Sequence, residues 1–285
     1  MAEIFGAVAG AISITALFNE CIDCFDYVQI ARNFGQDFSR FQLRLDVARC
    51  RLSRWGAAVN VNSNSRFMNS DESTVVLTQE ILQEIVARFE AAQKVSRRYK
   101  AKAEDASMEI CTETDLSSTS QRLHNRFTTR TLGRQSRVGL LKKTSWALYD
   151  KDYMARMIED IVTSINELEK VFPAAPQEIN QLARMEVEEL NDEKELDMLQ
   201  DVTKGLDPIL EVMAKHRLQE LTGKNSAGRI SGNGRVNIGH TFVKESFVHA
   251  QGLRDNTVNH VDEIDGGEMS RVNVGNTYGG TGFWH

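Results

Sequence analysis

Apolar side chains recur at the three-to-four-residue spacing of amphipathic helices through the first 222 residues. Pro173 and Pro176 interrupt this pattern and separate two expected helices. Gly223 suits the position just after a helix end. No alternating strand pattern occurs before residue 225, so the sequence predicts an all-α bundle of six to eight helices. The clearest expected helices cover residues 38–55, 77–99, 154–172, 179–187 and 210–221.

The helical period disappears from Asn225 onward. Eleven of the chain's 19 glycines and seven asparagines lie in these last 61 residues, which contain no proline. Composition alone is typical of disorder. However, RVNIGHTF at 235–242 and RVNVGNTY at 271–278 share five of eight positions, and the other three are I/V, H/N and F/Y. A tail that repeats a strand-like block, and that keeps every backbone donor because proline is absent, indicates β-structure.

A second matching block extends the repeats to 225–240 and 259–276. Apolar and polar residues alternate in each repeat, which gives one apolar face. Two short strands are marginal in water, and repeat folds normally need three units, so other copies of the chain must supply the missing neighbours. We expect a tail that is disordered when soluble and a two-rung β-solenoid when amyloid, with rungs about 4.7–4.8 Å apart. Arg229 above Glu263 would pair opposite charges and fix the register. The expected amyloid core consists of Asn225, Ala227, Ile230, Val236, Ile238, Asn259, Val261, Ile264, Val272 and Val274.

Further segments of the chain carry a resemblance to one known family. They are IFGAVAGAISITALFNECIDCFDYV at 4–28, RLSRWG at 51–56, KKTSWALYD at 142–150 and YGGTGFW at 278–284. Together with the two repeats they resemble the fungal HET-s/HET-S heterokaryon-incompatibility proteins over essentially the whole chain. The resemblance implies a helical HeLo domain at residues 1–222. It also implies a prion-forming domain at 223–285 that assembles as an amyloid β-solenoid with two rungs per molecule.

The resemblance also implies roles for individual tail residues. Asparagine ladders would stack Asn225 on Asn259 and His240 on Asn276, although His240 replaces the asparagine of the family pattern. The aromatic end would fold back over an apolar pocket of the solenoid, which neighbouring glycines permit. The residues of this aromatic end are Tyr278, Phe283 and Trp284.

Residues 4–18 contain no charged side chain. A run of this length is shorter than the roughly 20 residues that span a bilayer, and extension reaches Glu20, Asp23 and Asp26, which are costly at the bilayer centre. The apolarity fits a buried first helix equally well, and a helix can be buried at rest and inserted after activation. The candidate membrane segment, which contains a GxxxG spacing, consists of Ile4, Phe5, Gly6, Val8, Gly10, Ile12, Ile14, Leu17 and Phe18.

The resemblance implies how this segment acts. In toxic family members, amyloid formation by the tail refolds the helical domain and releases the segment into membranes, which kills the cell. Other members are inert partners that only propagate the prion, and the residues leave both types open here. The implied partners are other copies of the chain, related prion-domain proteins, a NOD-like receptor carrying a matching motif, and membrane lipid after activation.

A basic stripe formed by Arg122, Arg126, Arg130 and Arg134 follows i, i+4 spacing. Such a stripe can meet anionic lipid or nucleic acid, but it can equally be a solvated face opposite the acidic run at 186–195. The net charge of −6 and the absence of interleaved aromatic residues argue against nucleic acid. We therefore expect the solvated face.

The remaining signals argue for a non-enzymatic cytoplasmic protein, and the resemblance implies that it relocates to the cell membrane on activation. Four cysteines in 285 residues do not form a disulfide framework, and no basic stretch precedes the apolar N-terminus. Cys21 and Cys24 lack a second close pair for zinc, and HExxH, GxxxxGK[ST] and GxGxxG motifs are absent. We expect no catalytic residue, metal or cofactor. A rival interpretation is a helical scaffold whose tail adds strands to the edge of a partner.

Overall fold

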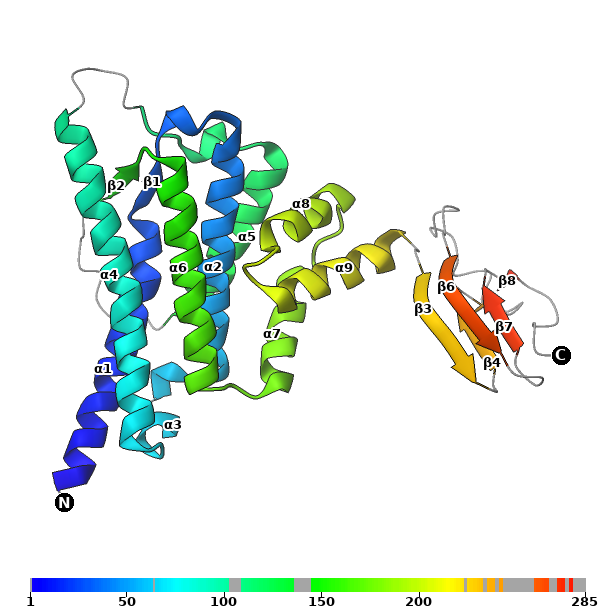
Figure 1. The fold of residues 1–285 in the computed structure, drawn as a ribbon, viewed down its shortest axis with the longest axis horizontal. Helices are drawn as coiled ribbons and strands as arrows, with labels where there is room; N and C mark the ends of the chain where they lie inside the picture. The colour runs from blue at the N-terminus through cyan, green and yellow to red at the C-terminus, as the bar shows by residue number, and fades with distance from the viewer. Residues whose placement is uncertain are drawn as a thin grey trace.

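The first 222 residues form a helical bundle in the computed structural model, and strands follow in the tail (Figure 1). This arrangement confirms the expected all-α bundle. The structure describes residues 2–63, 65–102, 109–135, 145–222, 225–232, 235–238, 241–242, 259–266, 271–274 and 277–278.

Nine α-helices occur within the described residues, one more than the sequence predicted. The sequence did not single out the one-turn helix α3 or the separate helix α8 that follows α7. Their bounds are α1 Ala2–Asp26, α2 Phe38–Ala58, α3 Ser65–Met68, α4 Glu72–Lys102, α5 Ser118–Arg134, α6 Lys151–Val171, α7 Pro176–Val187, α8 Glu193–Thr203 and α9 Pro208–Thr222. Three 3-10 turns connect them: η1 Arg32–Asp37, η2 Val61–Ser63 and η3 Glu113–Asp115.

Several helices begin where a side chain can satisfy the first backbone donors. The Tyr153 backbone N–H donates to Asp150 Oδ1 at 2.9 Å at the start of α6. The Thr74 N–H donates to Asp71 Oδ1 at 2.8 Å at the start of α4. Hydrogen bonds from Ser73 and Thr74 to the Asp71 carboxylate lower its pKa to about 2. These caps fix where α4 and α6 begin.

Helix α2 is buried along most of its length and lies among α1, α5, α6 and α7. Trp55 is fully buried, and its Nε1–H donates to the Phe172 carbonyl at 2.9 Å. The next residue, Gly56, allows the Phe18 ring of α1 to lie directly against the helix. A Cβ atom built on Gly56 would be only 2.2 Å from Phe18 Cζ. The absence of a side chain at this position therefore determines how closely α1 packs on α2.

One expectation about the helical region was wrong, because it contains two strands. β1 (Val28–Ile30) pairs in parallel with β2 (Trp146–Leu148), and Gln29 lies opposite Ala147. Three residues are too few to display an alternating pattern. The pairing is long-range and joins the end of α1 to the segment before α6.

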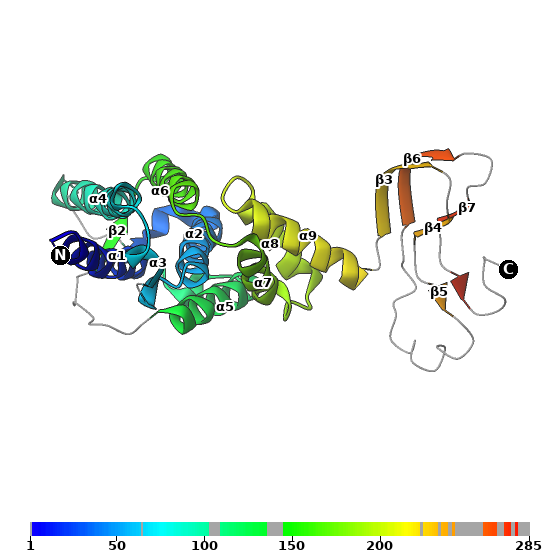
Figure 2. The ribbon, with the colours of Figure 1, turned by 90° about the horizontal axis from the view of Figure 1, so that it is seen from below.

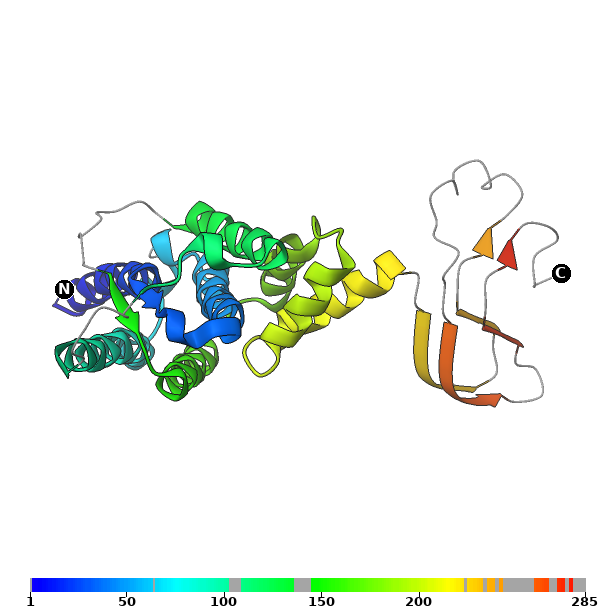
Figure 3. The ribbon, with the colours of Figure 1, turned by 90° about the horizontal axis from the view of Figure 1, so that it is seen from above.

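The tail contains three parallel strand pairs, each formed by one strand from either repeat. Figures 2 and 3 show the pairs following one another around a turn, each as its own small sheet. The same strands lie beyond the end of α9 in all three views of the chain. The strands are β3 Asn225–Gly232, β4 Arg235–Ile238, β5 Thr241–Phe242, β6 Asn259–Gly266, β7 Arg271–Val274 and β8 Thr277–Tyr278.

Candidate assembly site in the tail and its links to the bundle

The paired strands place the two repeats in the register that the sequence predicts. β3 pairs with β6, so Asn225 lies opposite Asn259. β4 pairs with β7, so Val236 lies opposite Val272 and the two following rows continue the match. The remaining matched pairs are Ala227 with Val261, Ile230 with Ile264, and Ile238 with Val274. Their role as an amyloid core stays a prediction.

A single copy of the tail leaves part of its apolar surface in water. Ile264 is 50% exposed and Val274 is 39% exposed. Both belong to the second repeat, whereas their partners Ile230 and Ile238 are half-buried. Large apolar side chains of one repeat therefore remain uncovered at one edge, where a further strand layer would bury them.

Charge pairs connect the two repeats in a fork. Arg229 Nε lies 3.4 Å from Glu263 Oε2, and Arg229 Nη2 lies 3.3 Å from Asp265 Oδ2. The first contact is the expected pair. The contact with Asp265 was not expected, because strand alternation places Glu263 and Asp265 on one side but does not show that one guanidinium reaches both. These side chains are 59–67% exposed, so the fork contributes more to register than to stability.

An amide contact in the second pair of strands was also missed. Asn273 Nδ2 donates to Asn237 Oδ1 at 2.7 Å across the two repeats. The sequence signal for this contact was the asparagine that both RVNIG and RVNVG carry at their third position. The same donor–acceptor step, repeated along a stack, is an asparagine ladder.

The remaining tail residues can be placed only in part. Tyr278 lies in β8, where its backbone pairs with Phe242 of β5. The Tyr278 side chain lies outside the described part of the chain, as do Phe283, Trp284, His240 and Asn276. The aromatic cover and the second family ladder therefore stay predictions.

The candidate membrane segment lies on α1, whose backbone is helical from Ala2 to Asp26. Ile14 is fully buried, Phe18 is 2% exposed, and Leu17 packs against the same core. The expectation of a buried first helix is confirmed from Ile14 onward. Among the described helices, none combines the length and apolarity that crossing a bilayer requires. The other residues of the segment lie where the structure describes the backbone alone: Ile4, Phe5, Gly6, Val8, Gly10 and Ile12.

The basic stripe of α5 is paired with the acidic run as expected, but the expected solvated face was wrong for Arg134, which is 11% exposed and pairs with the fully buried Glu186. Arg126 Nη1 lies 2.9 Å from Glu189 Oε2, and Arg130 Nη2 lies 3.2 Å from Glu189 Oε1. Arg122 contacts Asp192 at 2.8 Å and also Glu195. The stripe therefore joins α5 to α7 and α8, with its positive charge compensated.

Deeper in the bundle, a charge cluster joins α2 to the start of α9. Arg54 Nη1 lies 2.9 Å from Glu186 Oε2, and Arg54 Nη2 contacts Asp207. Arg134 Nη1 lies 2.7 Å from the other oxygen of Glu186. The side chains of Arg54, Glu186 and Asp207 are at most 2% exposed. We name these three residues the buried charge cluster.

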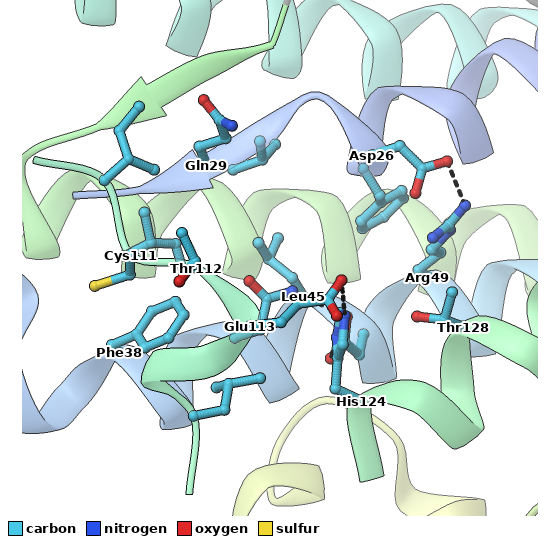
Figure 4. A pocket seen from close by; sticks show the side chains of 17 residues that line it. Asp26, Gln29, Phe38, Leu45, Arg49, Cys111, Thr112, Glu113, His124 and Thr128 are labelled. Atoms are coloured by element: carbon cyan, nitrogen blue, oxygen red, sulfur yellow. Dashed lines mark hydrogen bonds and ion pairs between the residues drawn. The ribbon is translucent and has the colours of Figure 1, made fainter. Parts of the chain in front are cut away.

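A cavity of about 400 Å³ opens beside the end of α1 (Figure 4). An ion pair and a hydrogen bond line it: Arg49 Nη2 lies 2.6 Å from Asp26 Oδ2, and His124 Nδ1 lies 2.8 Å from Asp46 Oδ2. The hydrogen bond to Asp46 raises the pKa of His124 above its ordinary value. The cavity wall thus joins α5 to α2 through His124 and Asp46, and α2 to α1 through Arg49 and Asp26.

Comparison with known proteins agrees with both halves of this architecture. The HeLo family, described as prion-inhibition and propagation, matches residues 6–199, and the family described as Het-s 218-289 matches residues 217–279. The whole chain is 40% identical to heterokaryon incompatibility protein s of Podospora anserina, and 99% of that relative is covered. It is 38% identical to heterokaryon incompatibility protein S of the same species, again with 99% of the relative covered.

Solved structures agree for the helical region. The HET-s N-terminal domain is similar with a TM-score of 0.69 and 39% identity, covering 73% of this chain and 98% of that one. A mutant form of that domain gives the same TM-score at 38% identity, covering 72% of this chain and 98% of its own. With both regions matched in order and at full length, the chain belongs to the HeLo/HET-s family of fungal heterokaryon-incompatibility proteins.

Proposed function

We propose that the tail assembles with other copies into a self-templating β-solenoid amyloid, and that this assembly controls the helical domain. The in-register parallel pairing of the two repeats is the observation that carries the proposal. The second repeat of one copy can stack on the first repeat of the next copy, because the apolar rows, the Arg229 fork and the Asn237–Asn273 contact then recur at each step. The partners are then further copies, related prion-domain proteins and a receptor that carries a matching motif.

The exposed edge of the second repeat supports this assembly. Burial of apolar surface contributes about 25 cal/mol per Å², and both Ile264 and Val274 have surface left to bury. Parallel addition of another copy would also satisfy the backbone groups along β6 and β7. Each added molecule recreates the same edge, which is the property that self-templating growth requires.

The difference between the spacing of the stacked tails and the size of the bundle couples the tail to the bundle. Two rungs advance a stack by about 9.5 Å per molecule, whereas a folded domain of 222 residues has a radius of gyration near 17 Å. Only residues 223–224 separate the end of α9 from the start of β3. Because two residues reach at most about 7 Å, neighbouring bundles would collide. Stacking therefore unravels the end of α9 and strains the bundle.

The strained bundle would release α1, which begins with the charge-free run at 4–18. Ile14 and Phe18 are covered only while the bundle is closed. Once exposed, this run has the apolarity to enter a lipid surface. The proposal is thus a protein that is cytoplasmic at rest and moves to the membrane on seeding, with programmed cell death as the outcome in a toxic type.

The test uses the full chain with preformed fibrils of the same chain as seeds. Seeded protein should convert to fibrils, lose hydrogen-exchange protection in α9 and bind vesicles that contain anionic lipid. Val274→Pro is the matched variant, because it removes a ladder donor from β7 and leaves the bundle untouched. Equal conversion of Val274→Pro would refute the solenoid. Conversion without vesicle binding would identify the inert type.

A further inference from the structure

We propose that the buried charge cluster is a latch that holds α9 on the bundle and sets the resistance of the bundle to conversion by the tail. The latch itself is a property of the resting structure. Its consequence for conversion rests on the proposed function.

The latch is built from three elements that are distant in sequence. Arg54 projects from α2, Glu186 lies on α7, and Asp207 immediately precedes α9. Arg51, one turn earlier on α2, donates from Nη1 to the Leu206 carbonyl at 2.6 Å. Two arginines of the central helix therefore bind the two residues that lead into the last helix.

The charges of the latch balance only together with Arg134, which pairs with Glu186 at 2.7 Å. Arg54 and Arg134 contribute two positive charges, and Glu186 and Asp207 contribute two negative charges. Removing one member leaves an uncompensated charge in a site that is almost closed to water, which is strongly unfavourable. The cluster therefore opposes every movement that withdraws Asp207 from Arg54.

Helix α9 is anchored unequally along its length. Leu210 and Ala214 near its start are fully buried, whereas Leu218 and Leu221 are only partly buried. The helix end is held by Arg217, which donates from Nε to the Leu190 carbonyl at 3.1 Å. Unravelling that starts at the tail can proceed through the outer turns, and it meets the latch when it reaches the start of the helix.

Asp207 has two roles that one substitution can separate. Its Oδ1 accepts from the Leu210 backbone N–H at 3.1 Å, which caps α9, while its Oδ2 contacts Arg54. Asn is as good a cap as Asp. Asp207→Asn therefore removes the charge of the latch and keeps the cap.

The experiment compares the full-length wild type, Asp207→Asn and a control, Glu189→Gln. Glu189 is 67% exposed and pairs with Arg126 and Arg130 near the same helices, so its loss removes surface ion pairs only. Hydrogen exchange is measured without seeds, with the amides of α4 as the internal reference. We expect hydrogen exchange in α9 to accelerate about 100-fold in Asp207→Asn, because a buried charge loses its partner. The amides of α4 should stay protected in all three proteins, and those of α9 should stay protected in the control.

Seeded conversion is measured on the same proteins, and Asp207→Asn should convert with a shorter half-time than the other two. If α9 of Asp207→Asn keeps the hydrogen-exchange protection of the wild type, the latch is overturned. It is also overturned if α4 loses protection together with α9, because the cluster would then stabilise the whole bundle rather than hold α9. If α9 of Asp207→Asn loses protection but the half-time of conversion stays at the wild-type value, the role of the latch in conversion is overturned. If the wild type does not convert at all, the proposed function is refuted. The hydrogen-exchange result then tests the latch by itself.

Discussion

The contact between Phe18 and Gly56 makes a sharp prediction about the seating of α1. In Gly56→Ala the added Cβ would lie 2.2 Å from Phe18 Cζ and 2.4 Å from Cε2, distances that real atoms do not adopt. Phe18 is 2% exposed and its ring centroid lies 6.1 Å from that of Trp55, so it has little space into which to move. We expect α1 to be displaced from α2.

Two opposing terms set the size of the effect. Replacing Gly by Ala inside a helix favours folding by about 1 kcal/mol. Overpacking a close-packed core typically costs about 1–3 kcal/mol. The free energy of unfolding of Gly56→Ala should therefore fall by about 0–2 kcal/mol. Gly133→Ala in α5 is the matched control, because nothing lies within 4 Å of its Cβ position. This control should gain up to about 1 kcal/mol.

Urea unfolding of the full chain, followed by tryptophan fluorescence, measures both variants. Phe18→Leu should reduce the cost of Gly56→Ala in a double-mutant cycle, because the shorter side chain leaves room for the methyl group. Stabilisation of Gly56→Ala equal to that of Gly133→Ala would show that α1 does not depend on this contact, and the reasoning would fail.

Three further predictions concern the tail and the bundle. Val236→Pro should abolish seeded growth because β4 loses a ladder donor, and unchanged thioflavin kinetics would count against the pairing. Arg229→Glu should slow growth at low salt and recover at high salt, since it places like charges beside Glu263; a wild-type salt profile would exclude the fork. The raised pKa of His124 stabilises the bundle below the unfolded pKa of about 6.5, and this stabilisation is lost as pH rises through the higher folded pKa. His124→Gln should flatten that loss in urea titrations from pH 5 to 8, and an unaltered slope would refute the assignment.

The regular elements were predictable because local sequence specifies them. The apolar spacing of α2, α4 and α6 is the direct consequence of 3.6 residues per turn. The register of the tail followed from a repeat in which Asn225 matches Asn259 and Val236 matches Val272. Both signals lie within a short window or in a visible duplication.

Contacts between distant segments could not be predicted in the same way. β1 and β2 are three residues each and pair across more than a hundred positions. Arg54 reads as a polar helix residue, yet it is buried because Glu186 and Asp207 approach from 132 and 153 residues away. Asp265 contacts Arg229 because the long guanidinium side chain reaches past Glu263, and this reach is a property of the folded strand pair. In each case a tertiary contact, rather than local propensity, decides the role of the residue.

Fibril mass per length tests the central claim most directly. If each molecule contributes two rungs, full-length fibrils hold one 32.1 kDa chain per about 9.5 Å. A stack with one layer per molecule would hold one chain per about 4.8 Å, which is twice the mass per length. Scanning transmission electron microscopy of unstained fibrils separates the two values. The lower mass per length is the predicted result, and the doubled value would contradict the stacking of the two repeats.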